Sequence, residues 1–212
     1  MERVYRTVPL HRIPWNIETP PDALVGLVDR GIVPPGRAID LGCGVGNYAI
    51  YLAGRGFDMT GVDVSPTAIT IARQNAKRKG VAVHFLVADI LGDMRQVQGT
   101  FDFAYDWEVL HHIFPDQRRK YVENVHRVLN PGSKYLSLSF SEQDPQFGGS
   151  GKYRKTALNT VLYFSSEAEL RDLFSPLFTI VELKSVTMEG KFGPHVANYV
   201  FMEKRQGDPE SP

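Results

Sequence analysis

The chain has 212 residues, 42% of them apolar and 23% charged, which are ordinary values for a globular protein able to bury one core without disulfides. Lys plus Arg equals Asp plus Glu at 24 each, so the net charge disfavours a protein whose main task is gripping nucleic acid. The single cysteine, Cys43, excludes an internal disulfide and a cysteine-based metal cluster. Without an apparent signal peptide or membrane span, we expect a cytoplasmic protein.

The first 140 residues predict alternating strands and helices. Residues 1–18 form a polar, aromatic-bearing arm, and a first helix runs from Asp22 to a stop at Gly31. Strands are then expected at 37–41, 58–62, 81–87, 101–105 and 134–140, and helices at 47–54, 66–79 and 116–129, the last closed by Asn130-Pro131-Gly132. This alternation predicts a doubly wound parallel sheet with helices on both faces.

The rhythm changes after Phe140. Residues 141–163 form a flexible basic segment that is too long for a simple connection, and a helix follows at 165–174. Strands at 178–187 and 196–204 around a turn at 190–194 predict a closing hairpin. The expected fold is therefore α/β, a mostly parallel seven-stranded, Rossmann-like sheet with an antiparallel C-terminal hairpin. The expected organisation is an arm over the site at 1–18, a domain at 19–205 with a covering insertion at 141–163, and a disordered tail at 206–212.

A glycine-rich loop lies between the first strand and its helix, with the sequence Asp40-Leu-Gly-Cys-Gly-Val-Gly46. Such a loop lets the backbone approach a ligand closely. A dinucleotide-binding G-x-G-x-x-G would place its third glycine at position 47, which is Asn47 here. The Asp40 carboxylate would also repel a pyrophosphate, whereas it favours S-adenosylmethionine, which carries an ammonium and a sulfonium and has no phosphate.

Asp40 to Gly46 resembles the first motif of the class I S-adenosylmethionine-dependent methyltransferases, and the resemblance covers about residues 37–140. It implies that Asp63, which follows Gly46 by 17 residues, holds both ribose hydroxyls, and that Asp89 contacts the adenine amino group. The cofactor would be S-adenosylmethionine, released as S-adenosylhomocysteine, and no metal is expected. The residues expected to hold the cofactor are Trp15, Asp40, Gly42, Cys43, Gly44, Gly46, Asn47, Asp63, Val64, Asp89, Ile90 and Asp106.

Each of these acids also has a purely structural interpretation. Asp40 could cap the following helix, and Asp63 could belong to a helix start with Ser65 as N-cap. Asp89 could be a surface turn residue. Three acids after three consecutive strands favour the cofactor interpretation. Cys43 is expected to contribute its backbone, with an incidental thiol.

The methyl acceptor is expected at the segment after the fourth strand, because ligands of open α/β sheets bind beyond the carboxyl ends of the strands. This segment, 105–113, contains Trp107, His111 and His112, but it lacks the [N/D]-P-P-[Y/F] tetrapeptide typical of base amino methylation. The histidines are candidate catalytic bases, since imidazole titrates near neutrality. The alternative is that one packs or caps a helix while the other is solvated.

Pro14-Trp15-Asn16-Ile17 resembles the entry segment of the thiopurine, thiol/halide and tellurite-resistance methyltransferases, where the arm closes over the cofactor. Tyr105-Asp106, Phe140-Ser141, Pro145 and Gly148-Gly149 resemble the thiopurine branch, whereas Leu110-His111-His112 resembles the broader small-molecule group. Lys152, Tyr153 and Arg154 are expected on the acceptor side, where they would attract an anion. The alternative is a solvated basic loop.

The sequence therefore predicts an enzyme that transfers a methyl group from S-adenosylmethionine to a sulfur, oxygen, nitrogen or similar nucleophile of a small molecule. No nucleic-acid or membrane partner is expected, and a monomer or a dimer is equally compatible. Two alternatives stay open. One is a non-catalytic S-adenosylmethionine sensor or regulatory subunit, and the other is a nicotinamide-dependent oxidoreductase, which Asp40 and Asn47 disfavour.

Overall fold

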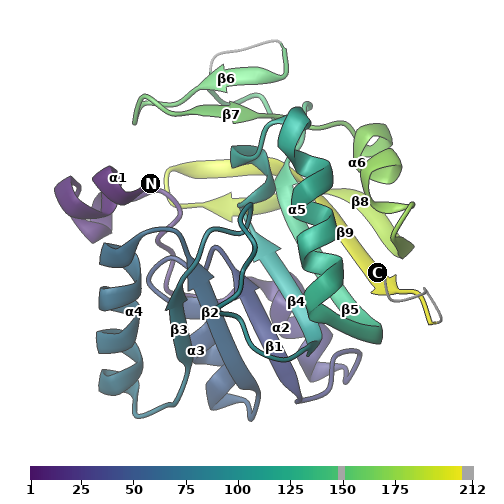
Figure 1. Ribbon diagram of the computed structural model, residues 1–212. Helices are drawn as coiled ribbons and strands as arrows, with labels where there is room; N and C mark the ends of the chain where they lie inside the picture. The colour runs from purple at the N-terminus through teal and green to yellow at the C-terminus, as the bar shows by residue number, and fades with distance from the viewer. Residues whose placement is uncertain (148–150, 207–212) are drawn as a thin grey trace. The chain divides into compact units, whose positions relative to one another are not determined.

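The structure is a computed structural model that describes residues 1–147 and 151–206, so Gly148-Gly149, which carries part of the thiopurine resemblance, and most of the predicted tail, 207–212, lie outside the described residues. Seven strands form one sheet in the order β3-β2-β1-β4-β5-β9-β8, and β6 and β7 form a second, two-stranded sheet (Figure 1). The predicted Rossmann-like sheet with an antiparallel C-terminal hairpin is confirmed. The chain forms two compact units, one of residues 1–99 and 189–194, the other of residues 100–188 and 195 onward.

The first unit contains three parallel strands, and in the first two of them every residue after the first position is buried. Its strands are β1 (Arg37–Leu41), β2 (Asp58–Asp63) and β3 (His84–Val87), and its helices are α1 (Glu2–Thr7), η1 (Leu10–Arg12), α2 (Asp22–Asp29), α3 (Asn47–Gly54) and α4 (Pro66–Lys79). β2 pairs in parallel with both β1 and β3. An apolar run such as Ala38-Ile39 is typical of a strand that is covered on both faces.

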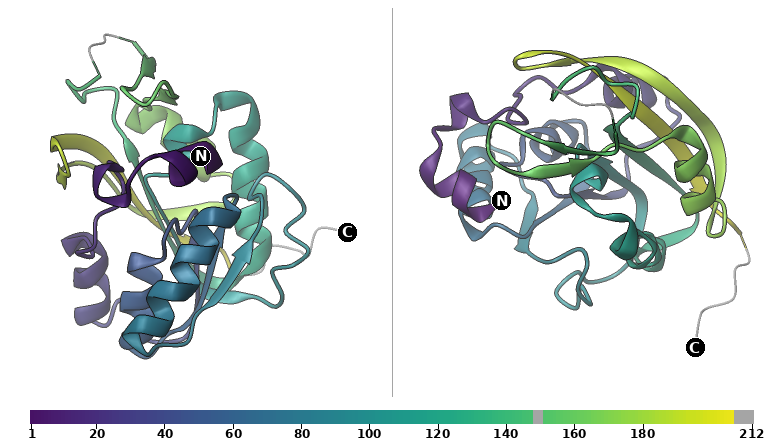
Figure 2. Two further views of the ribbon diagram at one scale, coloured as in Figure 1. Left: turned by 90° about the vertical axis from the view of Figure 1, so that its left-hand side faces the viewer. Right: turned by 90° about the horizontal axis from the view of Figure 1, so that it is seen from above.

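Two details of the first unit differ from the sequence prediction. The arm is not merely a polar extension, because it folds into α1 and η1 (Figure 2). It also buries Val4, Tyr5 and Ile13. The third strand begins at His84, three residues later than expected, because Val81 still belongs to the end of α4. Gly80 is left-handed there, and the Val81 N–H donates to the Ala76 carbonyl, which is the bond pattern of a glycine helix stop.

The second unit carries the hairpin and the remaining helices. Its elements are β4 (Phe101–Trp107), η2 (Leu110–His112), α5 (Pro115–Val128), β5 (Leu129–Phe140), β6 (Tyr153–Lys155), β7 (Val161–Tyr163) and α6 (Glu167–Phe174), with most of β8 (Phe178–Gly190) and β9 (Gly193–Lys204). β4 and β5 run parallel, and β5 pairs antiparallel with β9. None of the described helices has the length and apolarity needed to cross a bilayer.

Two predictions about the second unit were wrong. The expected turn between helix and strand at Asn130-Pro131-Gly132 is absent. β5 starts at Leu129 and includes these three residues, at the point where its register with β4 shifts. The described part of the segment 141–163 is also not simply flexible, since β6 and β7 pair within it and the Thr156 N–H donates to the Thr160 carbonyl. Arg154 is the middle residue of β6 and is buried, so this basic side chain packs inside the protein.

Candidate functional site

The glycine loop between β1 and α3 is tied to β2. The N–H groups of Gly42 and Cys43 both donate to the Val62 carbonyl, at 2.8 and 2.9 Å. Gly44 and Gly46 have φ of 53° and 80°, which a side chain rarely adopts. A Cβ atom on Gly44 would lie 2.7 Å from the Tyr5 hydroxyl, and one on Gly46 would lie 2.5 Å from Phe85 Cζ. The loop therefore needs glycine for both its conformation and its close packing.

Two buried carboxylates lie beside this loop, Asp40 in β1 and Asp63 as the last residue of β2. Asp40 and Asp63 are only 3% and 8% exposed. Asp63 Oδ2 accepts from the Gly44 N–H at 2.9 Å and Oδ1 from the Ser65 N–H at 2.8 Å. Burial raises the pKa of Asp63, partly offset by these bonds. Each carboxylate oxygen can accept more than one hydrogen bond, so Asp63 keeps acceptor capacity for a ligand.

The structural interpretations of Asp63 and Asp89 hold alongside the ligand interpretation, but Asp40 does not cap the following helix, because the N-cap of α3 is Gly46 and no side chain caps it. Ser65 is the N-cap of α4 and accepts from the Ala68 N–H at 3.1 Å. Asp89 is exposed, and its Oδ1 accepts from the Leu91 N–H at 2.9 Å, as a turn residue would. Val64, next to Asp63, is 54% exposed. Contacts of Asp89, Ile90 and Val64 with the cofactor stay predictions.

Cys43 is not prepared for nucleophilic attack. Burial raises the pKa of its thiol well above the usual value, and the negative charges of Asp40 and Asp63 raise it further. Since the thiolate is the reactive form, the protonated thiol is inert near neutral pH. This agrees with the expectation that the thiol is incidental.

Tyr5 of the arm belongs to this site and was missed in the sequence. Trp15 Nε1 donates to its hydroxyl at 2.8 Å, and the two rings meet edge to face at 6.2 Å. Burial and the Asp63 charge raise the pKa of Tyr5, so the hydroxyl above Gly44 stays protonated. The only signal in the sequence was the apolar pair Val4-Tyr5 between charged residues of α1.

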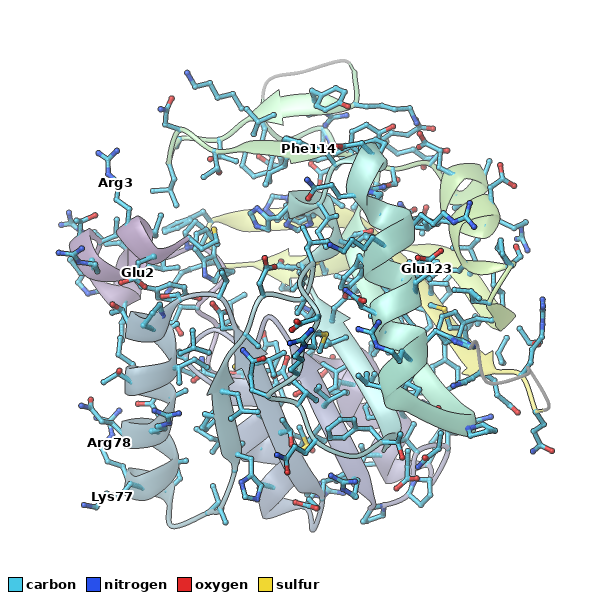
Figure 3. The ribbon with its side chains drawn as sticks, viewed as in Figure 1. Glu2, Arg3, Lys77, Arg78, Phe114 and Glu123 are labelled. Carbon is cyan, nitrogen blue, oxygen red and sulfur yellow. The ribbon has the colours of Figure 1, made fainter. Side chains whose placement is uncertain are left out.

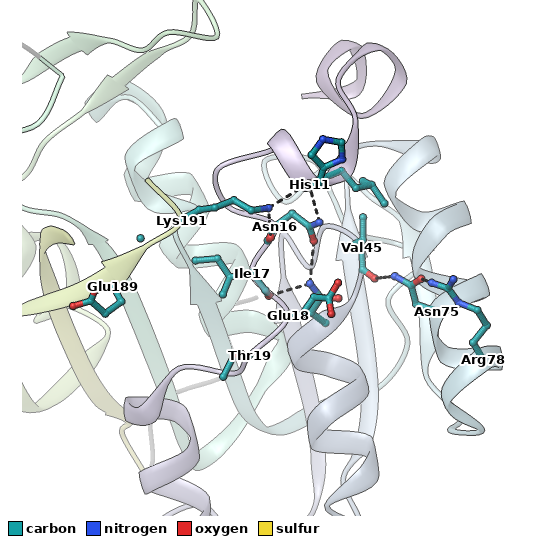
Figure 4. A pocket seen from close by; sticks show the side chains of 13 residues that line it. His11, Asn16, Ile17, Glu18, Thr19, Val45, Asn75, Arg78, Glu189 and Lys191 are labelled. Atoms are coloured by element: carbon teal, nitrogen blue, oxygen red, sulfur yellow. Dashed lines mark hydrogen bonds between the residues drawn. The ribbon is translucent and has the colours of Figure 1, made fainter. Parts of the chain in front are cut away.

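The arm is held to the first unit by side chains of distant elements. Asn47 Nδ2 donates to Asn16 Oδ1 and to the Ile17 carbonyl, both at 3.0 Å, so this amide holds the arm. Lys191 donates to the Asn16 carbonyl at 2.9 Å (Figure 4). It also donates to the carbonyls of Leu10 and Ile13, at 3.4 and 3.2 Å. Both side chains line a hollow of about 950 Å³ beside the arm.

At its other end the arm is anchored on α4. The Glu2 carboxylate accepts from the Ser65 and Thr67 hydroxyls at 2.5 and 2.6 Å, and from the Thr67 N–H at 3.2 Å. These bonds lower the pKa of Glu2. Glu2 lies at the start of α4 (Figure 3). A carboxylate is favourable at this place, because the start of a helix presents unpaired N–H groups. The α1 end of the arm is thus fixed next to Asp63, the predicted ribose-binding acid.

In the second unit, Asp106 at the end of β4 lies inside the core. It is fully buried, and Oδ2 accepts from the hydroxyls of Tyr135 at 2.5 Å and Tyr121 at 3.0 Å. Burial raises its pKa to about 6. The side chain therefore holds β4 against α5 and β5, and its contact with a ligand stays a prediction. The neighbouring Glu108 has a left-handed backbone with φ 64°, and burial raises its pKa to about 7.

The two candidate histidines differ in what they can do. His111 is 2% exposed and stacks on Phe140 at 4.2 Å, and its Nδ1 faces the Phe140 N–H at 3.3 Å. Because a backbone N–H can only donate, Nδ1 holds the lone pair and Nε2 carries the proton. Burial lowers the pKa of His111 well below its usual value and that of His112 to about 4. His111 is thus a neutral hydrogen-bond donor, and of the two only His112 could act as a base.

The basic loop is engaged internally. Lys152 forms ion pairs with Glu142, at 2.9 Å, and with Glu169. The Arg154 guanidinium is buried over the Phe164 ring at 4.1 Å and donates to carbonyls of residues 142, 144, 146 and 151. The solvated interpretation is therefore wrong for Arg154, while Tyr153 is 60% exposed. Their role on the acceptor side stays a prediction.

A second histidine site in this unit was not foreseen. His195 Nδ1 lies 3.0 Å from Asp144 Oδ2, although the two residues are 51 positions apart. The sequence placed His195 just beyond a turn, with no acidic neighbour to suggest a pair. Across the described ranges, 1–147 and 151–206, no group of His, Cys, Asp and Glu side chains is arranged to hold a metal ion.

Comparison with known proteins places the chain in a family. Residues 38–132 match the methyltransferase domain family. The 2-heptyl-1-hydroxyquinolin-4(1H)-one methyltransferase of Mycobacteroides abscessus is 31% identical over 175 residues, which cover 81% of this chain and 71% of that protein. The chain belongs to the S-adenosylmethionine-dependent methyltransferases.

Two further matches are also methyltransferase-like in sequence or fold. A solved structure described for the conversion of a disulfide bond into a thioacetal group during echinomycin biosynthesis is 30% identical, with a TM-score of 0.81, and covers 98% of this chain and 92% of that one. A probable thiol methyltransferase 2 of Arabidopsis thaliana is 25% identical over 60% of this chain and 56% of its own length. The predicted family, cofactor and activity, methyl transfer from S-adenosylmethionine to a small molecule, are confirmed, and none of these matches supports the sensor alternative.

Proposed function

We propose that this methyltransferase acts on the hydroxyl group of a planar, largely apolar heteroaromatic molecule. The observation that carries the proposal is an aromatic cluster in the second unit. Phe140 stacks on Phe164 at 5.5 Å and contacts Phe147 at 5.9 Å, within a core cluster against which Trp107 also packs. Such rings bind flat ligands, since each aromatic pair contributes about 0.5–1.5 kcal/mol beyond its buried area.

The charges of this unit support the same class of acceptor. Lys152 is paired with two glutamates and Arg154 with backbone carbonyls. The positive charges of both side chains are therefore already engaged, which disfavours an anionic acceptor. The relative from M. abscessus is named for a bicyclic ring with an N-hydroxyl and a heptyl chain, which has the proposed chemistry. Its match covers 81% of this chain, compared with 60% for the thiol methyltransferase.

The first unit would hold the cofactor. Two buried carboxylates beside a loop with no room for a Cβ at Gly44 or Gly46 suit a cationic amino-acid nucleoside that lies close to the backbone. Asp63 would bind the ribose hydroxyls, Asp40 would balance the positive charge, and the arm of residues 1–18 would cover the cofactor through Tyr5 and Trp15. When bound, S-adenosylmethionine supplies an electrophilic methyl group on a sulfonium. The protein would hold the acceptor in line with it and exclude water.

Turnover with a matched set of acceptors tests the proposal. Purified protein and S-adenosylmethionine are incubated with 2-heptyl-1-hydroxyquinolin-4(1H)-one, with the same quinolone lacking the N-hydroxyl, with thiophenol and with a hydrophilic thiol. S-adenosylhomocysteine is then quantified and the product mass measured. We expect methylation of the hydroxyquinolone and none of the analogue without the hydroxyl. Turnover confined to thiols would refute the proposed acceptor and favour a sulfur nucleophile.

The aromatic cluster is tested by one substitution and its control. Phe147→Leu removes a ring that contacts Phe140 and Phe164. We expect the KM for the aromatic acceptor to rise about 5- to 10-fold, because ring stacking of this order is lost. Phe192→Leu, at a position that is 70% exposed in the β8–β9 turn, should leave this KM unchanged. An unchanged KM for Phe147→Leu would remove the cluster from the acceptor site.

A further inference from the structure

The side chain of Asp144 is fully buried, and its hydrogen bonds determine which ring nitrogen of His195 carries the proton. Asp144 Oδ1 accepts from the Gln146 N–H at 2.6 Å, and Oδ2 accepts from the Val196 N–H at 2.7 Å. Both partners are donors, so the carboxylate acts as an acceptor throughout. His195 Nδ1, 3.0 Å from Oδ2, therefore donates the third bond. In the neutral ring this leaves the lone pair on Nε2, the arrangement that makes an imidazole a base.

The His195 ring lies at the end of the sheet where ligands bind. It is near the start of β9, and Ala197 pairs with Phe140, the last residue of the parallel strand β5. Ligands of open α/β sheets bind beyond this carboxyl end. The ring stacks against Phe140 at 4.6 Å and Phe147 at 5.5 Å, within the aromatic cluster proposed to hold the acceptor. Its side chain is 15% exposed, so part of the ring stays accessible.

The charged and titratable groups around His195 are compatible with a base. Asp144 would stabilise the imidazolium that forms on proton uptake. His111 is close enough to influence His195 electrostatically but is itself neutral, since burial and neighbouring positive charges lower its pKa. The Arg154 guanidinium is bonded to the Asp144 carbonyl and leaves the carboxylate oxygens to His195 and the backbone. The two histidines thus offer opposite functions: His111 a donor N–H, His195 a lone pair.

We propose that His195, oriented by Asp144, is the base that removes the proton from the methyl acceptor. The inference rests on the proposed function in that the acceptor must have a proton to lose. The acceptor O–H bond breaks and its proton passes to His195 Nε2. The oxygen electron pair forms the new O–CH₃ bond, and the electron pair of the broken C–S⁺ bond stays on sulfur as a neutral thioether. The imidazolium, paired with Asp144, then releases its proton to water.

The kinetic test compares His195→Gln, Asp144→Asn and a control, His84→Gln, whose histidine is exposed at the start of β3 in the first unit. The acceptor is whichever hydroxyl or thiol compound the wild-type enzyme methylates. At neutral pH we expect kcat for His195→Gln to fall by about 100-fold, the lower range for general-base catalysis, with a smaller loss for Asp144→Asn. The loss should disappear as rising pH ionises the acceptor in solution. The Kd for S-adenosylmethionine and the activity of His84→Gln should stay within twofold of wild type.

Imidazole ¹⁵N shifts of the wild-type protein provide a readout that needs no turnover, and we expect His195 to show the Nδ1–H tautomer. An Nε2–H tautomer, or kcat of His195→Gln within twofold of wild type, would overturn the proposal. A loss of kcat that persists at high pH would also overturn it, because a merely structural defect is not rescued by acceptor ionisation. Turnover of thiols alone would refute the hydroxyl acceptor of the proposed function. The role of His195 as the base would then be decided by the same kinetic comparison with a thiol as the acceptor. Turnover restricted to acceptors with no proton to lose would refute His195 as the base.

Discussion

Replacing Gly46 by alanine should reveal how tightly the cofactor loop is built. Gly46 has φ 80°, and an added Cβ would lie 2.5 Å from Phe85 Cζ and 3.1 Å from Ala72 Cβ. A side chain in a left-handed conformation costs about 1–2 kcal/mol, and overpacking against buried neighbours adds about 1–3 kcal/mol. We therefore expect Gly46→Ala to lower the free energy of unfolding by about 2–5 kcal/mol.

Gly80→Ala is the matched control, because Gly80 has φ 68° but nothing within 4 Å of an added Cβ. It should cost only the backbone strain of about 1–2 kcal/mol. Urea unfolding followed by circular dichroism measures both variants, and calorimetry measures the Kd for S-adenosylmethionine. We expect weaker binding only for Gly46→Ala, whose loop must shift. Equal destabilisation of the two variants would show that the packing of Phe85 against the loop is looser than described.

Three further outcomes are expected. Lys191→Met removes three hydrogen bonds to arm carbonyls, so hydrogen exchange at residues 10–17 should quicken by about tenfold, and unchanged exchange would show that Lys191 does not hold the arm. His112, with a pKa lowered to about 4, binds fewer protons in the folded than in the unfolded state between pH 4 and 6.5, so stability should fall on acidification through that window. His112→Gln should flatten this slope in urea unfolding, and an unaltered slope would contradict the lowered pKa. Arg154→Met should destabilise the second unit by about 2–4 kcal/mol in thermal unfolding, because several carbonyls lose a charged donor, and a loss below 0.5 kcal/mol would contradict its structural role.

Much of the fold could be predicted because its signals are local. The bounds of β1, α3 and α4 agree with the expected ranges, since proline, glycine and N-cap residues stand at their ends. The cofactor assignment was equally local, because acids after successive parallel strands meet at one edge of a sheet. The pairing of β6 with β7 was missed, since neither short strand shows the alternation that marks a half-buried strand.

The sequence by itself determined the sheet architecture, the glycine loop and the family of the enzyme, because these depend on spacing along short stretches of chain. Only the tertiary structure decided which polar groups meet. Tyr5 reaches Gly44, and Asp144 reaches His195, across separations that no periodicity records. It also decided that His111 presents a donor and that Arg154 is internal. Protonation and tautomer follow from burial and from the partner at each nitrogen, and these exist only once the chain has packed.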